Sequence, residues 1–484
     1  MQVLWFLSWY VISTLTGWAA FPLAYRFFPR LPDRGYALAR ALGWLLWGYL
    51  FWVLGSLGLL QNDLGGEIFA FLLLAGFAAA AAWGKYWADI REWLASHRRY
   101  LLSAEAVFLL AFALMAVIRA TNPTIDGTEK PMELAFLNAI LKSPTFPPHD
   151  PWLSGYAISY YYFGYVLVTM FIRLSGAATG VGFNLAIALL FGLTALGAYG
   201  ILYDLLALRP RRAERGQGVH PPLGLPVLGP IFILVMGNLE GILAVLHDRG
   251  IFWTQSGGTW QSGFWSWLGV LELNQPPLLP LSWIPHYSFI PWWRASRVLA
   301  DYTLSGGFKE VIDEFPFFSY LLSDLHPHVL AMPFALLMVG LGMNIWRAAR
   351  EKGLSLFGFQ LPFSRGGFLL TAVLLGSLAF LNTWDFPIYV ALAAGAFALG
   401  RLPVRGWRWT LLGDFAGFGL IMGFCGAVLY IPFYIGFSSQ AGGIIPSMVF
   451  FTRGTQFWVM FGTLLVPILA FLAWQLASRR GVKP

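Results

Sequence analysis

The chain has 484 residues, of which 58% are hydrophobic and only 11% are charged, whereas soluble domains carry about a quarter charged residues. This composition and the mean hydropathy of +0.65 exclude a soluble globular protein. The net charge of +8 does not indicate nucleic-acid binding, because the basic residues gather in short loops beside apolar runs. These runs are continuous and about 20 residues long, so they predict an all-α polytopic membrane protein.

The N-terminal part of the chain contains four apolar runs. They lie at 3–25, 36–60, 66–84 and 101–119. The basic loops 26–34 and 85–99 follow the first and third runs, and the positive-inside rule places both loops in the cytoplasm. The N-terminus is then outside, and the fourth helix brings the chain to the outer side of the cytoplasmic membrane at Thr121.

Two further apolar runs, 156–174 and 182–207, raise a conflict of charge. If both crossed, the basic residues of loop 209–215 would lie outside, against the positive-inside rule. The run 156–174 opens with several tyrosines, and tyrosine favours the membrane interface. We therefore expect 156–174 to be a juxtamembrane helix on the outer surface and 182–207 to be the fifth span.

The later runs raise the total to about eleven crossings. They lie at 223–246, 326–346, 367–400, 410–431 and 457–477. The run 367–400 lies between basic loops and is broken by the motif NTWDFP, so we expect it to cross twice as two short helices. The basic tail after 477 places the C-terminus in the cytoplasm.

The first outer loop, 121–181, carries the acidic candidates for catalysis. Asp126 sits on an Asp-Gly turn just outside a predicted span, where it could act as a general base or hold a divalent cation, Mg²⁺ or Mn²⁺. Glu129 begins a helical stretch, so complementing the helix dipole explains it nearly as well as catalysis does. Asp150 lies later in the same loop and is a candidate for substrate binding.

The aromatic run Tyr160, Tyr161 and Tyr162 is the second feature of this loop. It could form part of an aromatic belt at the membrane interface. It could also stack on a sugar or shape a lipid entrance, and the run itself does not decide between these uses.

The second outer segment, 247–325, is rich in Trp, Pro and Gly and is expected to be a packed loop. Its candidates for substrate binding are His286, Arg294 and Arg297. The two arginines lie three residues apart, on one face if helical, and could grip a phosphate. Contact with lipid headgroups is the simpler explanation.

A third polar group, Asp324, His326 and His328, precedes the span 326–346. A carboxylate and imidazoles can bind a transition metal, but alternate residues across a proline seldom reach one ion, which favours a polar network. If the chain holds a metal, its ligands are expected to be Asp126 with Glu129, or Asp324 with His326. Asp385, in NTWDFP, is either functional or the cap of the next helix.

Several motifs together resemble the YYY-domain family of prokaryotic integral membrane proteins. They are DGTEKPMELAFLNAIL, FPPHDPWLSG, YYYFGY, EFPFFSYLLSDLHPHVLAMPFALL and NTWDFPIY. The resemblance covers about residues 100–450. The family is named after a run of tyrosines, which stands in this chain at Tyr160–Tyr162. It implies an integral membrane protein and names no reaction.

The layout also resembles, more loosely, that of the GT-C glycosyltransferases. Residues 1–84 then form three additional N-terminal transmembrane helices, and 85–484 form a GT-C-like core with the outer loops 121–181 and 247–325. This resemblance implies transfer of a sugar from a polyprenyl-phosphate donor to an acceptor outside the cytoplasmic membrane. Asp126 and Glu129 match the acidic motif of these enzymes, and 156–174 matches a juxtamembrane helix.

Two other functions remain open on sequence grounds. The chain could be a non-catalytic subunit of an energy-transducing or pigment-binding complex, with its 23 Trp, 42 Phe and 19 Tyr packing against partners and lipid. It could also be a transporter, because Asp385 between two half-spans resembles an ion site near the membrane midplane.

Overall fold

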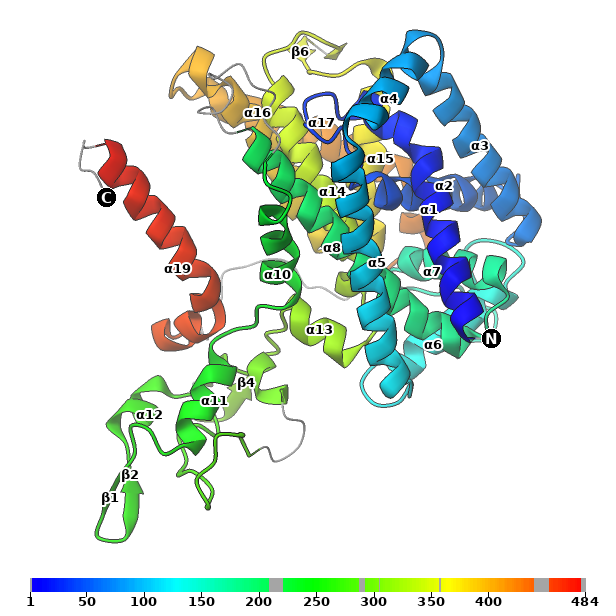
Figure 1. The fold of residues 1–484 in the computed structure, drawn as a ribbon. Helices are drawn as coiled ribbons and strands as arrows, with labels where there is room; N and C mark the ends of the chain where they lie inside the picture. The colour runs from blue at the N-terminus through cyan, green and yellow to red at the C-terminus, as the bar shows by residue number, and fades with distance from the viewer. Residues whose placement is uncertain are drawn as a thin grey trace. The chain divides into compact units, whose positions relative to one another are not determined.

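The fold is almost entirely helical and divides into two compact units (Figure 1). The computed structural model describes residues 2–208, 221–286, 292–303, 305–356, 358–438 and 452–479. Unit 1 combines residues 1–230 with 323–439, and unit 2 combines 231–322 with 440–484. The predicted basic loop 209–215 and the end of the basic tail lie outside the described residues.

Eight helices in the described part of the chain are long and apolar enough to cross a membrane. Seven belong to unit 1: α1 (Gln2–Phe27), α3 (Leu64–Ala82), α5 (Arg98–Thr121), α8 (Thr179–Ala207), α14 (Pro327–Ala348), α16 (Asp385–Arg405) and α17 (Thr410–Leu429). The eighth, α19 (Gly454–Arg479), belongs to unit 2. The chain is a multi-pass membrane protein, as its composition predicts, and the more detailed expectation of about eleven crossings stays a prediction.

The core of unit 1 lies around α8 and α14. The most apolar stretch of α8 is 89% buried and that of α14 is 67% buried, whereas α5 is only 22% buried. Exposed leucines, valines and phenylalanines cover the outer helices. Because lipid is as apolar as a protein core, these exposed faces are the surface that the membrane covers.

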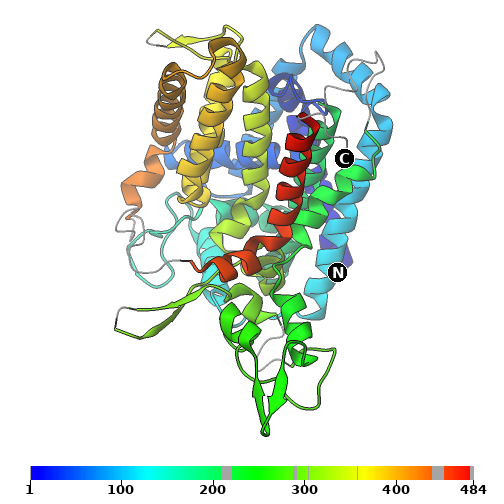
Figure 2. The same ribbon diagram turned by 90° about the vertical axis from the view of Figure 1, so that its left-hand side faces the viewer.

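Three shorter helices complete the interior of unit 1. They are α2 (Ala39–Ser56), α7 (Phe163–Ser175) and α15 (Arg365–Leu381). In both views α2 runs across the direction of the long helices rather than along them (Figures 1 and 2). It coincides with the predicted span 36–60 but does not belong to the helices that are apolar enough to cross.

The predicted surface helix at 156–174 is wrong in its position. The helix α7 begins only at Phe163, and every residue from 163 to 172 is buried. It packs against α2, α6, α8, α14 and α15. Its apolar side chains suit a protein interior as well as a membrane surface. The tyrosines before it, which favour the membrane interface, therefore led to a wrong prediction of its position.

The predicted span 223–246 is also wrong, because it is not one helix. It contains η1 (Leu225–Val227), α10 (Leu228–Leu234) and α11 (Glu240–Asp248). Between the last two, the side-chain amide of Asn238 donates to the carbonyl of Ala295 at 2.5 Å, and the N–H of Leu239 donates to the carbonyl of Val459 at 2.8 Å. These bonds take the place of the hydrogen bonds that a continuous helix would form here, so the chain does not run on as one membrane-spanning helix.

Glycines allow the helices of unit 1 to approach one another closely. A Cβ at Gly164 in α7 would meet Leu330 of α14 at 2.7 Å, and one at Gly376 in α15 would meet the carbonyl of Gly426 in α17 at 2.5 Å. Such approaches are typical of membrane helix packing. The break between α15 and α16, which the motif NTWDFP predicts, is confirmed at residues 382–384.

Unit 1 has a basic end. The helix α4 (Lys85–Ser96) and the hairpin β5–β6 (Ser355–Leu356 and Phe359–Gln360) lie at one end of unit 1, whereas α6 (Lys130–Lys142) lies at the other (Figure 1). Arg401 joins the end of α16 to this hairpin and to the end of α14, because it donates to the carbonyls of Gln360 and Ala349. The short helix α18 (Ile431–Gly436) follows α17.

Unit 2 is built from short elements around a small apolar core. The elements are α11, α12 (Gly263–Leu268), η2 (Trp293–Ser296), α13 (Pro316–Leu322), α19, and the antiparallel hairpins β1–β2 (Thr254–Ser256, Thr259–Gln261) and β3–β4 (Ala300–Tyr302, Phe308–Glu310). Trp265, Val298 and Val459 are central to its core.

A carboxylate–histidine cluster as the candidate functional site

The beginnings of α6 and α14 are tied together although they lie almost 200 residues apart in the sequence. The hydroxyl of Thr128 donates to a carboxylate oxygen of Asp324 at 2.8 Å. The backbone N–H of Leu325 donates to Oε2 of Glu133 at 2.6 Å. These bonds bring the first acidic loop and the Asp-His motif, both singled out in the sequence, to one end of unit 1.

Three side chains converge at this junction: Glu129, Glu133 and His326. One ligand-type atom from each lies within 4.8 Å of the other two. Oε2 of Glu129 is 3.5 Å from Nε2 of His326. Within the described residues this is the one group of three such side chains close enough to share a metal ion. We call these three residues the carboxylate–histidine cluster.

Glu133 is the most deeply buried member of the cluster. Its side chain is 0% exposed, and its Oε1 has no hydrogen-bond partner within the described structure. Burial, followed by the negative charge of Asp324, raises the pKa of Glu133 to about 9. The carboxyl group is therefore protonated at neutral pH when no cation is nearby.

Glu129 occupies the N-cap position of α6 but makes no capping hydrogen bond. Its side chain is 49% exposed and faces His326 instead. The helix dipole still favours a negative charge at this position, but the carboxylate itself makes no hydrogen bond to the helix terminus. Its position between solvent and the buried Glu133 makes Glu129 the accessible edge of the cluster.

The backbone beside the cluster is strained at two residues that are not glycine. Thr128 has φ of +48° and Ser323 has φ of +63°. This left-handed region is uncommon for such residues, and least favourable for a β-branched one. Strained residues of this kind gather at functional sites. Here the conformation of Thr128 accompanies the bond between its hydroxyl and Asp324.

Asp324 and His328 flank the cluster without belonging to it. Asp324 is buried and lies 3.9 Å from the ammonium group of Lys130. The rings of His326 and His328 are 5.1 Å apart. Asp385 begins α16. Because the β5–β6 hairpin leads from α14 into α15 at the opposite end, α15 ends and α16 begins at the end of unit 1 where α14 starts (Figure 1).

The other acidic candidates of the first loop are not members of the cluster. Asp126 is exposed and is not a member of the group. Asp150 accepts hydrogen bonds from the backbone of Trp152 and Leu153, both at 2.8 Å, so its carboxylate closes a turn. Asp150 also lines an open pocket of about 670 Å³ beside α6.

The three consecutive tyrosines have three different environments. Burial, followed by the charge of Glu129, raises the pKa of Tyr160, which also packs against Phe136 of α6. Tyr161 contacts Tyr160 and lies partly exposed. Tyr162 is buried, and its hydroxyl accepts a hydrogen bond from the indole of Trp52 at 3.2 Å. Tyr160 is therefore the tyrosine of this run whose pKa is raised by the charge of a cluster residue, Glu129.

The basic candidates His286, Arg294 and Arg297 belong to unit 2. Arg294 pairs with Glu272 at 2.7 Å and with Glu310, so two carboxylates already occupy its guanidinium group. Arg297 bonds to the carbonyl and hydroxyl of Ser296 and lies over the ring of Trp293 at 4.4 Å.

His286 is part of a second polar group in unit 2. Its Nδ1 lies 3.2 Å from Oδ2 of Asp248. The other oxygen of Asp248 lies 2.7 Å from Nδ1 of the buried His247. Sequence reasoning passed over both Asp248 and His247, because neither lies in an outstanding motif.

Glu133 was also not among the candidate residues that the sequence indicated. Its position in the first turn of a helix gave it an ordinary explanation. The signal that points to it is spacing, since Glu129 and Glu133 lie four residues apart and share one face of α6. The approach of His326 came from a distant part of the chain and could not be read locally.

Comparisons with known proteins place the chain in one family. A family model described as uncharacterized membrane protein (DUF2298) matches residues 46–483. No curated protein and no solved structure matches the chain. The cluster and Tyr160 lie within the matched region, which covers all but the first 45 residues of unit 1 and the last residue of unit 2. The chain therefore belongs to the DUF2298 family of membrane proteins.

Proposed function

We propose that the chain is a membrane glycosyltransferase that moves a sugar from a polyprenyl-phosphate donor to an acceptor at the carboxylate–histidine cluster. The observation that carries this proposal is the convergence of Glu129, Glu133 and His326 at one end of an apolar helix bundle. Acid–base groups gathered where a lipid meets water suit a lipid-linked substrate. The looser resemblance of the layout to the GT-C glycosyltransferases supports the same function.

The charge distribution of unit 1 supports an outer position for the cluster. The elements at the end of unit 1 opposite to α6 carry basic side chains (Figure 1): Arg91 in α4, Arg347 and Arg350 at the end of α14, Arg401 and Arg405 in the last turns of α16, and Arg30, which pairs with Glu351. Basic loops mark the cytoplasmic face of membrane proteins. The cluster and the N-terminus then face away from the cytoplasm, and the basic tail of the sequence is the separate ground for a cytoplasmic C-terminus.

In the proposed reaction the acceptor hydroxyl attacks the anomeric carbon of the donor sugar. Asp126, exposed beside the cluster in sequence, takes the proton of that hydroxyl. The bond from the anomeric carbon to the phosphate oxygen breaks, and the lipid phosphate leaves with the electron pair. Inversion at the anomeric carbon follows from this single displacement. Glu129 assists at the open edge of the cluster.

The test is sugar transfer by the purified chain in lipid vesicles supplied with a polyprenyl-phosphate sugar. We expect Asp126→Asn and Glu129→Gln each to lower the transfer rate by at least about 100-fold, since each removes an acid–base group. Asp150→Asn is the matched control, because an amide oxygen can still close the turn at Trp152. Transfer at the wild-type rate by both variants would rule out the assigned roles.

A transporter is the second candidate, and Glu133 is the observation that favours it. A buried carboxyl group that holds a proton at neutral pH suits proton-coupled transport. Proton-dependent uptake into vesicles, abolished by Glu133→Gln in a chain that transfers no sugar, would establish this function instead.

A further inference from the structure

We propose that Glu129, Glu133 and His326 bind one divalent metal ion, Mn²⁺ or Zn²⁺. As the cation used in sugar transfer, this ion rests on the proposed function. As a binding site it stands on the arrangement of the three side chains and can be measured without any transfer.

The three side chains need little movement to reach one ion. Their ligand atoms lie within 4.8 Å of one another. Donor atoms that surround a tetrahedral ion at about 2.1 Å lie about 3.4 Å from one another. The 3.5 Å between Glu129 and His326 already meets this spacing. The other separations must close by at most about 1.4 Å, which rotamer changes of the partly exposed Glu129 and His326 can provide.

The buried oxygen of Glu133 indicates that the cluster receives a ligand. A buried polar atom without a partner costs free energy, and Oε1 of this fully buried side chain has none within the described residues. Its second oxygen accepts the N–H of Leu325, which fixes the orientation of the carboxylate. In metal sites, hydrogen bonds of this kind hold a carboxylate ligand in the orientation that it needs to bind the ion.

Within the described residues, no lysine or arginine forms an ion pair or hydrogen bond with the carboxylate of Glu133. Lys130 is the basic residue next to Glu129 in the sequence, but its ammonium group pairs with Asp324 at 3.9 Å. In their ionised forms the two cluster carboxylates carry two negative charges, which one divalent ion balances. Asp324, bonded to Thr128 and near Lys130, adds further negative potential beside the site.

The kinds of donor atom select the ion. Imidazole nitrogen suits transition metals and carboxylate oxygen suits Mg²⁺ or Mn²⁺, so a mixed set of one histidine and two glutamates favours Mn²⁺ or Zn²⁺. Mg²⁺ prefers oxygen donors and retains several waters. Three protein ligands leave at least one coordination position open. A phosphate oxygen of a lipid-linked substrate has the chemistry to fill it.

The experiment is a titration of the full chain, purified in detergent and stripped of metal, with Mn²⁺ and separately with Zn²⁺. Free Mn²⁺ is followed by electron paramagnetic resonance, and Zn²⁺ by competition with a chromophoric chelator. We expect one equivalent to bind, and Glu133→Gln and His326→Gln each to weaken binding by at least about tenfold. Asp126→Asn is the matched control and is expected to retain wild-type affinity, because Asp126 is exposed and outside the cluster.

Folding of the variants is checked by their unfolding midpoints. Glu133→Gln keeps an acceptor for the N–H of Leu325. If it nevertheless unfolds, Glu129→Gln takes its place, since the Glu129 side chain is half exposed and, within the described residues, makes no hydrogen bond or ion pair besides its approach to His326. Unchanged affinity in the folded cluster variants, or no binding by the wild-type chain, overturns the proposed site.

The outcomes separate the metal site from the proposed function. Metal binding by the wild-type chain and Asp126→Asn, without sugar transfer by either, overturns the transferase and leaves the site. Sugar transfer that survives chelation, by a chain that binds neither ion, overturns the site and leaves the transferase.

Discussion

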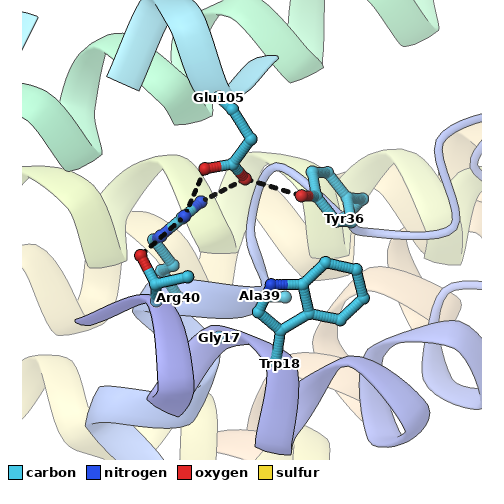
Figure 3. Close-up of a pocket in the computed structure, with 7 residues that line it drawn as sticks. Gly17, Trp18, Tyr36, Ala39, Arg40 and Glu105 are labelled. Atoms are coloured by element: carbon cyan, nitrogen blue, oxygen red, sulfur yellow. Dashed lines mark hydrogen bonds and ion pairs between the residues drawn. The ribbon is translucent and has the colours of Figure 1, made fainter. Parts of the chain in front are cut away.

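Two carboxylates in the interior of unit 1 show opposite arrangements. Glu105 of α5 accepts hydrogen bonds from both terminal nitrogens of Arg40, at 3.0 and 2.6 Å, and from the hydroxyl of Tyr36 at 2.6 Å (Figure 3). The guanidinium group of Arg40 also donates to the hydroxyl of Thr14. The cavity that these side chains line is about 10 Å³, which is room for about one water molecule.

Glu133 is more deeply buried than Glu105 and has fewer partners. It is 0% exposed, against 25% for the side chain of Glu105, and it receives one backbone N–H instead of an arginine and a tyrosine. A buried charge with matched partners holds helices in place. A buried carboxyl group without them, beside a second carboxylate and an imidazole, is typical of a functional site. Four stability measurements can break or sharpen this contrast.

The largest expected effect comes from breaking the matched pair. Arg40→Met leaves Glu105 without its cation and removes the contact of the guanidinium with the ring of Phe108 at 4.4 Å. We expect a loss of about 3–5 kcal/mol in the free energy of unfolding, measured by denaturant titration in micelles. The double variant Arg40→Met, Glu105→Leu should recover most of this loss. A loss below about 1 kcal/mol in the single variant would contradict the structural role.

A smaller effect is expected at the tyrosine of the same group. Tyr36→Phe removes the O–H that donates to Oε1 of Glu105 at 2.6 Å. A hydrogen bond to a charged group contributes about 1.5–3 kcal/mol. Tyr10→Phe is the control, because the described structure gives the Tyr10 hydroxyl no hydrogen bond although its ring stacks on Phe108. Equal stability of the two variants would show that the bond to Glu105 contributes nothing.

A third carboxylate, Glu240 in unit 2, should make stability depend on pH. Burial, followed by the charge of Glu272, raises its pKa from 4.5 to about 7. The folded chain therefore binds this proton more tightly than the unfolded chain does. Stability from this group is full below about pH 4.5 and falls as the pH rises through 7, by up to about 1.4 kcal/mol per pH unit. Glu240→Gln should flatten unfolding curves across this window, and an unchanged slope would refute the assignment.

The smallest change in stability is expected at Glu133. Glu133→Gln keeps an acceptor for Leu325 and removes a carboxyl group that has no cationic partner. We expect the free energy of unfolding of the metal-free chain to change by less than about 1 kcal/mol, since no matched interaction is lost. A loss comparable to that of Arg40→Met would make Glu133 a structural residue like Glu105.

The membrane spans could be predicted because their signal is local. A run of about 20 apolar residues identifies a span such as 101–119 without knowledge of its neighbours. The break at NTWDFP is local in the same way. The burial of α7 was not predictable, since apolar residues suit both lipid and a protein core. The break at Asn238 depends on Ala295 and Val459, which lie far along the chain.

The candidate site was predictable in its parts and not in its assembly. The acid at Glu129 and the imidazole at His326 stand out in the sequence as separate motifs. Their meeting depends on the bonds between the start of α6 and the residues just before α14, which no local pattern encodes. Asp126 stood out more strongly than Glu133, yet the structure leaves Asp126 exposed and buries Glu133 in the cluster.

The most direct measurement of the central claim is sugar transfer by Glu129→Gln in lipid vesicles, with a polyprenyl-phosphate sugar as donor and the wild-type chain beside it. If the cluster is the working site, transfer falls by at least about 100-fold while the unfolding midpoint stays at the wild-type value, because the Glu129 side chain is half exposed. Transfer at the wild-type rate by the folded variant would contradict the claim.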